Sequence, residues 1–189
     1  MNNKYIILGI CGPSAAGKDT LAYALEKEGM YRLVSDTTRP ARSYEKDGVD
    51  YHFISTPHFL LDKNYLEWTE FRGWCYGTNK NRLKPGINVG VFNPSGMIQL
   101  SQKEDIILIP ILLEYPLIKR LRRSYLRENK WKLEYFRRAW TDFKDFKRFK
   151  KFLNNRLNNC LVLKNYESTA SQISRIKLHL NQLSLGNFL

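Results

Sequence analysis

This chain of 189 residues contains little cysteine and histidine, three residues of each. The cysteines lie far apart at Cys11, Cys75 and Cys160 and form no C-x-x-C pair. An odd number of widely separated thiols does not suit a disulfide framework and favours reduced cysteines. The histidines also lack the spacing of zinc ligands, so we expect no metal centre built from protein ligands alone.

Long apolar runs are missing as well, since no segment approaches the length of about 18 apolar residues that a membrane span requires. The N-terminal residues 1–4 lead directly into the first apolar run, without the features of a signal peptide. These observations predict a soluble, cytoplasmic protein. Repeats, low-complexity tracts and proline- or serine-rich linkers are also absent, so the length favours one domain with inserted lobes.

Positive charge is in excess and is concentrated in one segment. The net charge is +13, and residues 117–156 contain 15 Lys or Arg against 4 Asp or Glu, which leaves +11 in that segment. A basic surface attracts polyanions, so nucleotides, nucleic acid and anionic lipid are all candidate partners. Aromatic residues lie between the basic ones, which keeps nucleic-acid binding open as a less favoured alternative.

The stretch GPSAAGKDT, residues 12–20, predicts a phosphate-binding loop. It follows the apolar run Tyr5–Ile10 and precedes a helical spacing of apolar residues that ends at Gly29. In such a loop the backbone N–H groups surround a phosphate and the lysine reaches the terminal phosphates. The alternative is a glycine-rich turn between a buried strand and a helix. The loop therefore predicts a polyphosphate ligand, and the residues that we expect to bind it are Gly12, Ser14, Ala15, Ala16, Gly17, Lys18, Asp19 and Thr20.

Asp19 stands where a phosphate loop normally has Ser or Thr, whose hydroxyl binds Mg²⁺. A carboxylate is also a hard oxygen ligand for this ion, so Asp19 is a candidate ligand for the Mg²⁺ that accompanies ATP. The alternative is that Asp19 only favours the positive end of the helix, while Thr20 supplies a hydroxyl one residue later.

Hydrophobic patterning predicts the remaining elements. The expected strands are 31–35, 51–55, 66–71, 74–78, 87–92, 106–111 and a final buried strand at 161–163, with a hairpin turn at 72–73 and irregular chain at 36–42. The expected helices are one capped by Thr56, one at 94–103, a basic helical segment at 114–157, and a closing helix with Ile173, Ile176, Leu180 and Leu183 on one face.

Several motifs, taken in order, resemble the guanylate kinase family. They are GPSAAGK at 12–18, VSDTTRPARSYEKDGVDYHFIS at 34–55, LEWTEFRGWCYGT at 66–78, and a later arginine-rich segment. The combination of TTRPAR with E-x-D-G-x-D-Y-x-F is the most specific, because fold requirements alone do not demand it. The resemblance is strong through Thr78 and weaker afterwards.

The resemblance implies an α/β fold: a three-layer α/β/α P-loop core with a parallel sheet, a small mixed β/α monophosphate lobe and a helical lid. The chain would be one guanylate-kinase-like domain, with its core at about 1–35, 81–118 and 157–189, its lobe at about 36–80 and its lid at about 119–156.

The implied activity is transfer of the γ-phosphoryl group of ATP to GMP or dGMP, with Mg²⁺, in nucleotide metabolism. The partners would be these small nucleotides, with no membrane, and the protein a monomer or a homodimer. A deoxynucleoside monophosphate kinase of another base specificity and a non-catalytic binding module are the alternatives.

The resemblance assigns the phosphate of the monophosphate to Arg39, Arg42 and Tyr51. Two guanidinium groups and a phenol can saturate the phosphate oxygens with charge-assisted hydrogen bonds. The alternative is that the arginines bind nearby acids, which are Asp36, Glu45, Asp47 and Asp50.

Glu67 and Thr78, with Ser35 nearby, match the positions that read guanine in the family. An ionised carboxylate accepts the N1–H and N2–H donors of guanine, and a hydroxyl donates to O6. The alternative for Glu67 is a solvent-facing strand residue. Tyr76 and Asn93 complete the implied monophosphate site.

The sequence departs from the family pattern L-D-I-D-x-Q-G at residues 90–96, where Val91 and Asn93 replace the two acids. We hypothesise that Asp19 restores part of the lost negative charge near Mg²⁺.

The basic segment resembles the family's lid, whose arginines contact the donor phosphates. Arg120, Arg123, Arg137 and Arg138 are the candidates, with Arg122 and Arg127 as competitors. Lys18, Arg39, Arg123 and Arg138 would then be the catalytic residues. Asn165 follows the last predicted strand, where the family has an adenine-contacting loop. The alternative for most of the other basic residues is a solvated helix surface over buried aromatic side chains.

Overall fold

The computed structural model describes residues 4–128, 149, 159–164 and 167–185. The predictions for Arg137, Arg138 and Asn165, and for most of the lid, lie outside these residues. Within the described ranges, no helix is long and apolar enough to cross a membrane.

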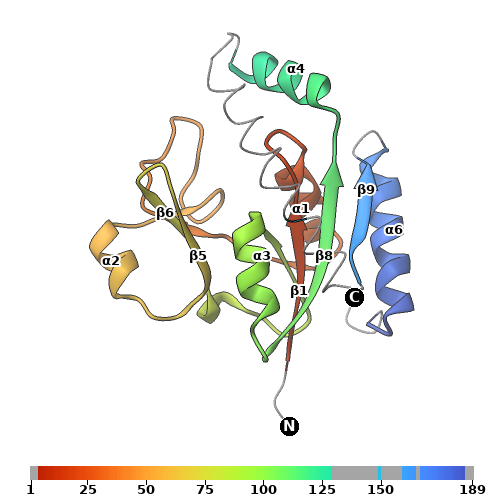
Figure 1. The fold of residues 1–189 in the computed structure, drawn as a ribbon, viewed down its shortest axis with the longest axis horizontal. Coiled ribbons are helices and arrows are strands. Elements are labelled where there is room, and N and C mark those ends of the chain that lie inside the picture. The colour runs from red at the N-terminus through yellow and green to blue at the C-terminus, as the bar shows by residue number, and fades with distance from the viewer. Residues whose placement is uncertain (1–3, 129–148, 150–158, 165–166, 186–189) are drawn as a thin grey trace.

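A parallel sheet of five strands forms the centre of the molecule (Figure 1). In spatial order its strands are β2 (Tyr31–Arg32), β7 (Ile87–Val91), β1 (Tyr5–Cys11), β8 (Ile106–Glu114) and β9 (Leu161–Lys164). Because the strands are parallel, their carboxyl ends lie along one edge of the sheet, and the loop after β1 emerges there.

Helices cover both faces of this sheet. Side chains along β1 point alternately to the two faces and pack against different helices. Ile6, Leu8 and Ile10 pack with the buried residues of α1 (Lys18–Lys27) and α6 (Thr169–Gln182). Ile7 and Cys11 face the other way and pack with Met97 and Leu100 of α3 (Pro94–Ser101). Successive strand residues point to opposite faces, so one apolar run supplies both halves of the core.

A second, mixed sheet lies beside the core (Figure 1). Its strands, in spatial order, are β4 (His52–Phe53), β3 (Asp36–Thr37), β6 (Trp74–Asn79) and β5 (Tyr65–Phe71). The helix α2 (Thr56–Leu61) precedes β5, and the short 3₁₀ helix η1 (Lys80–Arg82) follows β6 on the way back to the core. We call this unit the small sheet.

The hairpin β5–β6 is confirmed, together with its turn. Arg72 and Gly73 both have positive φ angles, 59° and 77°. Two such residues in succession make the tight turn whose twist matches that of the flanking strands. Gly29 likewise ends α1 as predicted, with φ of 93° and an N–H that donates to the Glu26 carbonyl.

Three predicted boundaries on the N-terminal side were wrong. The strand expected at 31–35 is only Tyr31–Arg32, and Asp36–Thr37, expected to be irregular, forms β3 in the small sheet. The chain leaves one sheet and joins another within a few residues, which periodicity does not reveal. The cap of α2 is Ser55 and not Thr56, because the Ser55 hydroxyl accepts the His58 N–H.

Two further corrections concern the C-terminal half. β8 runs to Glu114, so the helix expected from residue 114 begins only at Leu117, as α4 (Leu117–Glu128). β9, expected to be buried, is an edge strand in which Leu163 is buried while Val162 is 40% exposed. Of the aromatic side chains expected to be buried in the basic segment, Phe149 lies in the core cluster beside α3.

Candidate functional site

The loop between β1 and α1 has the backbone geometry of an anion-binding cradle. Ala15 and Gly17 have positive φ angles of 60° and 89°, and α1 begins at the next residue, Lys18. Such alternation turns successive N–H groups toward one point, and the first turn of the helix adds its own N–H groups there. The Lys18 ammonium donates to the carbonyl oxygens of Gly12 and Pro13, at 2.9 and 3.1 Å. Its charge is therefore held over the loop.

Gly12 allows this loop to lie against β8. A Cβ atom at position 12 would lie 2.8 Å from the backbone oxygen of Leu113. Any side chain there would push the loop away from the sheet edge, so the glycine is required for close approach.

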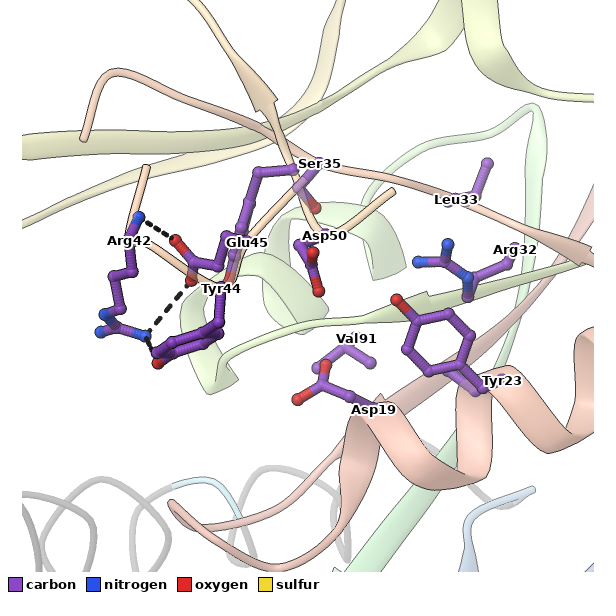
Figure 2. Close-up of a pocket in the computed structure, with 12 residues that line it drawn as sticks. Asp19, Tyr23, Arg32, Leu33, Ser35, Arg42, Tyr44, Glu45, Asp50 and Val91 are labelled. Carbon is purple, nitrogen blue, oxygen red and sulfur yellow. Dashed lines mark hydrogen bonds and ion pairs between the residues drawn. The ribbon is translucent and has the colours of Figure 1, made fainter. Parts of the chain in front are cut away.

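A cavity of about 230 Å³ lies between α1 and the segment that leads into the small sheet (Figure 2). Figure 2 shows Arg42 and Glu45 at one side of it, Tyr23 and Arg32 at the other, and the Asp19 carboxylate from the start of α1. Ser35 and Tyr51 also line it. The cavity therefore joins the start of the helix after the phosphate loop to residues predicted for the monophosphate.

Arg39 and Arg42 both bind Glu45, which is the acid-binding alternative raised from the sequence. Arg39 donates from Nη2 to both carboxylate oxygens of Glu45, at 2.8 and 2.9 Å. Arg42 donates to the same carboxylate from its backbone N–H, at 2.8 Å, and from Nη1, at 3.3 Å. The Glu45 side chain is only 5% exposed, so one buried carboxylate holds two guanidinium groups side by side.

Tyr51 lies next to these arginines, with the Arg39 guanidinium carbon 5.5 Å from its ring centroid. The Tyr76 ring meets it edge-on, at 6.0 Å between centroids. Burial, with a further contribution from the negative charge of Asp19, raises the pKa of the Tyr51 phenol to about 12. The phenol therefore stays protonated and can donate a hydrogen bond at neutral pH.

Glu67, Thr78 and Ser35 come together as predicted. Glu67 and Thr78 are paired across the hairpin, and the Ser35 and Thr78 hydroxyl oxygens lie 3.2 Å apart. Glu67 is 6% exposed, so the alternative of a solvent-facing strand residue is wrong. Burial raises the pKa of Glu67 to about 7, against hydrogen bonds from Thr78 that act in the opposite direction. The site therefore holds a carboxyl group that can change its charge near neutral pH.

The two positions that lack the expected acids have different surroundings. Val91 lines the cavity that Asp19 also lines. Asn93 is exposed, and its side-chain oxygen accepts the Gly96 N–H at 2.7 Å, which makes it the N-cap of α3. Asp19 faces the cavity, whereas Thr20 is exposed and does not line it. In the described part of the chain, no group of three or more His, Cys, Asp or Glu residues is arranged to hold a metal ion.

The start of α4 lies above the phosphate loop (Figure 1). Arg120 donates from Nη1 to the Ser14 carbonyl at 3.3 Å. Arg123 stacks on Tyr115, with its guanidinium carbon 4.0 Å from the ring centroid. The structure thus places Arg120 at the phosphate loop. Arg123, about one helical turn after Arg120, packs against the Tyr115 ring.

Comparison with known proteins matches residues 2–90 to the model of the family "Guanylate kinase". The match covers 89 of the 189 residues, so the N-terminal half of the chain is similar to guanylate kinases.

Several guanylate kinases are similar to this chain, over segments of different length. The protein of Helicobacter hepaticus is 46% identical over 88 residues, which are 44% of this chain and 42% of that protein. The protein of Mycoplasma genitalium is 33% identical over 65% of this chain and 58% of its own length, so the chain spans about half of these relatives. The protein of Clostridium perfringens is 29% identical over 94% of this chain and 84% of its own length.

A solved structure also matches. The guanylate kinase from Anaplasma phagocytophilum has a TM-score of 0.67, covering 95% of this chain and 86% of that one, at 20% identity. This likeness confirms the predicted fold, an α/β core with a parallel sheet beside a small mixed sheet. The family-level similarity in sequence is concentrated before residue 90, as the motifs indicated.

Some residues that line the cavity were not predicted from the sequence. Tyr23 follows Asp19 by one helical turn, so the (i, i+4) spacing on α1 could have placed it at the cavity. Arg32 had no such signal. Its guanidinium stacks on Tyr23 at 4.2 Å and donates to Glu26 at 3.0 Å and to the Val49 carbonyl at 2.9 Å.

Proposed function

We propose that this protein is an ATP-dependent guanylate kinase, which transfers the γ-phosphoryl group of ATP to GMP or dGMP. The observation that carries the proposal is the shared cavity, which Asp19 of the phosphate-loop helix lines together with Ser35, Arg42 and Tyr51. Two nucleotides bound from these two sides would meet at their phosphates. Direct transfer requires that meeting.

On the ATP side, the backbone N–H groups of residues 12–17 other than Pro13 would bind the phosphates. Lys18, held over the loop by two carbonyl oxygens, would transfer its hydrogen bonds to the terminal phosphates. The exposed Asp19 carboxylate on the cavity wall fits a Mg²⁺ ion held mainly by the nucleotide phosphates. When bound, this ion neutralises charge on the phosphoryl group.

On the monophosphate side, Arg39, Arg42 and Tyr51 would hold the acceptor phosphate. Glu45 keeps both guanidinium groups in place, and the protonated Tyr51 phenol adds a donor. The acceptor phosphate is itself the nucleophile, so no general base is required. Catalysis would come from positioning in line with the γ-phosphate and from stabilisation of charge.

The base would lie between the hairpin and Ser35. An ionised Glu67 would accept the N1–H and N2–H donors of guanine. The Ser35 and Thr78 hydroxyl groups, which bond each other in this structure, would turn to donate toward O6. Tyr76, which packs on Tyr51, would line the nucleotide between base and phosphate.

The division into core, monophosphate lobe and lid is part of the same proposal. The small sheet corresponds to the lobe at about 36–80, and α4 begins the lid at about 119–156. Arg123, released from Tyr115, and Arg138 would close over the donor phosphates.

A kinase for a different deoxynucleoside monophosphate is the second candidate. The observation that favours it is the replacement of both family acids after β7, by Val91 at the cavity and by Asn93 as a helix cap. Base selection would then rest on Glu67, Thr78 and Ser35 alone.

Turnover across the common nucleoside monophosphates, measured as ADP formed from ATP and Mg²⁺, tests both candidates. We expect GMP and dGMP to give the highest kcat/KM. A different preferred base would establish the second candidate, and failure to bind ATP would instead support a non-catalytic binding module.

A further inference from the structure

The outer edge of the small sheet lies against core helix α3, and one side chain of that helix bonds to the backbone of the edge strand. β5 is the last strand in the spatial order of that sheet, so among the described residues no strand pairs with its outer backbone edge. On that edge the Trp68 N–H donates to Oε1 of Gln99 at 3.1 Å, and Nε2 of Gln99 donates to the Trp68 carbonyl at 2.9 Å. The Gln99 amide thereby takes the place of a partner strand and sets where β5 lies along α3.

The residue before Trp68 is Glu67, whose carboxyl group lies against the first turn of the same helix. A Cβ atom built on Gly96 would be 2.6 Å from Oε2 and 3.2 Å from Cδ of Glu67. Gly96 has no positive φ angle, so its backbone conformation does not require glycine. What requires it is the space that the carboxyl group occupies.

Gly96 and Gln99 are three residues apart and therefore lie on one face of α3. The helix itself is firmly placed: Asn93 caps it, and Met97 and Leu100 are fully buried in the core. The core thus determines the position of α3, and α3 determines the position of the strand that carries Glu67.

We propose that Gln99 and Gly96 are positioning residues that set how far the Glu67 carboxylate reaches toward the base, and so select a purine with donors at N1 and N2. This inference rests on the proposed function. Gln99 acts by holding the backbone beside Glu67, and Gly96 acts by leaving room for its carboxyl group. In this proposal neither residue contacts the nucleotide.

The first test is Gly96→Ala, because it separates stability from binding. Alanine favours a helix over glycine, so the melting temperature should stay equal or rise. The new methyl group displaces the carboxylate, so KM for GMP should rise about tenfold while kcat stays within about twofold. Ser101→Ala, at the other end of α3, is the matched control and should leave KM unchanged.

The second test is Gln99→Ala, with Gln99→Glu as the conservative variant. Alanine removes both bonds to Trp68, and glutamate keeps the acceptor for its N–H while losing the donor for its carbonyl. We expect KM for GMP to rise in Gln99→Ala, by less in Gln99→Glu, and not in the control Gln102→Ala.

The decisive measurement is the ratio of kcat/KM for GMP to that for IMP, which lacks the 2-amino group. A fall of this ratio in Gly96→Ala and Gln99→Ala supports the proposal. An unchanged ratio or an unchanged KM for GMP, in variants of an active enzyme, would overturn it and leave the proposed function intact. A wild-type protein that does not phosphorylate GMP would refute the proposed function and this inference together.

Discussion

The phosphate loop and the group of Ser35, Glu67 and Thr78, which we call the phosphate end and the base end, are constructed in different ways. The phosphate loop is continuous in sequence, and its binding groups are main-chain N–H groups that a glycine-containing turn and the start of α1 orient. The base end consists of side chains from separate segments, Ser35, Glu67 and Thr78, and depends on burial and on a strand held by α3. The phosphate end therefore depends on backbone conformation and on Lys18, whereas the base end depends on side chains that only the folded chain brings together.

The phosphate loop and the base end also differ in the source of their charge. Charge at the loop comes from a helix terminus and from Lys18, which remains bonded to backbone carbonyls. Charge at the base end comes from Glu67, and burial there disfavours the ionised form that would accept guanine in the proposed function. The phosphate end thus carries a positively charged side chain, whereas burial favours the protonated form of Glu67 at the base end.

Lys18→Ala should have the largest effect, because it removes the one mobile cation of the phosphate loop. Turnover should fall by about 10²–10³-fold or more, since charge on the transferring phosphoryl group loses its partner. GMP binding, measured by calorimetry, should be nearly unchanged, because the base end is built elsewhere. Lys27→Ala, in the last turn of α1, is the control. Appreciable turnover in Lys18→Ala would refute the kinase assignment.

Glu67→Gln should weaken recognition of the base and leave ATP binding unchanged. The variant loses the acceptor for one guanine donor and the charge behind both bonds, so kcat/KM for GMP should fall by about 10²-fold. The Kd for ATP should not change, and the melting temperature should hold or rise, because a buried acid is replaced by a neutral amide. A weakened affinity for ATP would contradict the separation of the two ends.

The pH dependence of GMP binding tests the role of Glu67 at the base end. Glu67 must be ionised to accept guanine, and its pKa is raised to about 7, so GMP affinity should increase about tenfold from pH 6 to pH 8. Ionisation of the GMP phosphate occurs in the same range, so Glu67→Gln is the reference. The difference between the pH profiles of GMP affinity for the wild type and Glu67→Gln gives the contribution of Glu67. Identical profiles for the two proteins would show that ionisation of Glu67 does not control GMP binding.

The same shift predicts the sign of an effect on folding. Because the folded-state pKa of Glu67 lies above its ordinary value, the unliganded protein binds this proton more tightly than the unfolded chain does. This tighter binding of the proton by the folded protein adds to the free energy of unfolding. The added stability is fully present below the pKa of Glu67 in the unfolded chain and is lost as the pH rises toward 7. Denaturant unfolding of wild type and Glu67→Gln at pH 5 and pH 8 measures it.

Asp19→Ser should have the smallest effect, a few-fold increase in the Mg²⁺ concentration needed for half-maximal rate. The hydroxyl is a weaker ligand than the carboxylate, and Val91 at the same cavity supplies no charge. Titration of Mg²⁺ at fixed ATP measures the change. An unaltered Mg²⁺ dependence would remove the idea that Asp19 replaces the missing acids of the strand.

Local sequence was sufficient wherever the structure depends on local chemistry. The phosphate loop, the stop of α1 at Gly29 and the hairpin turn at Arg72-Gly73 were all predictable, because each depends on φ angles or spacing within a few residues. The motifs of the family then placed Glu67, Thr78 and Ser35 in one site, and they do lie together.

Tertiary structure alone decided the features that depend on contacts between distant residues. Periodicity could not show that Asp36–Thr37 joins a second sheet, that Arg39 and Arg42 share one buried Glu45, or that Gln99 holds the edge of β5. Burial by other segments also raises the pKa of Glu67, which its position in a strand does not indicate. Spacing encodes backbone conformation, whereas burial and long-range pairing arise only when the segments pack.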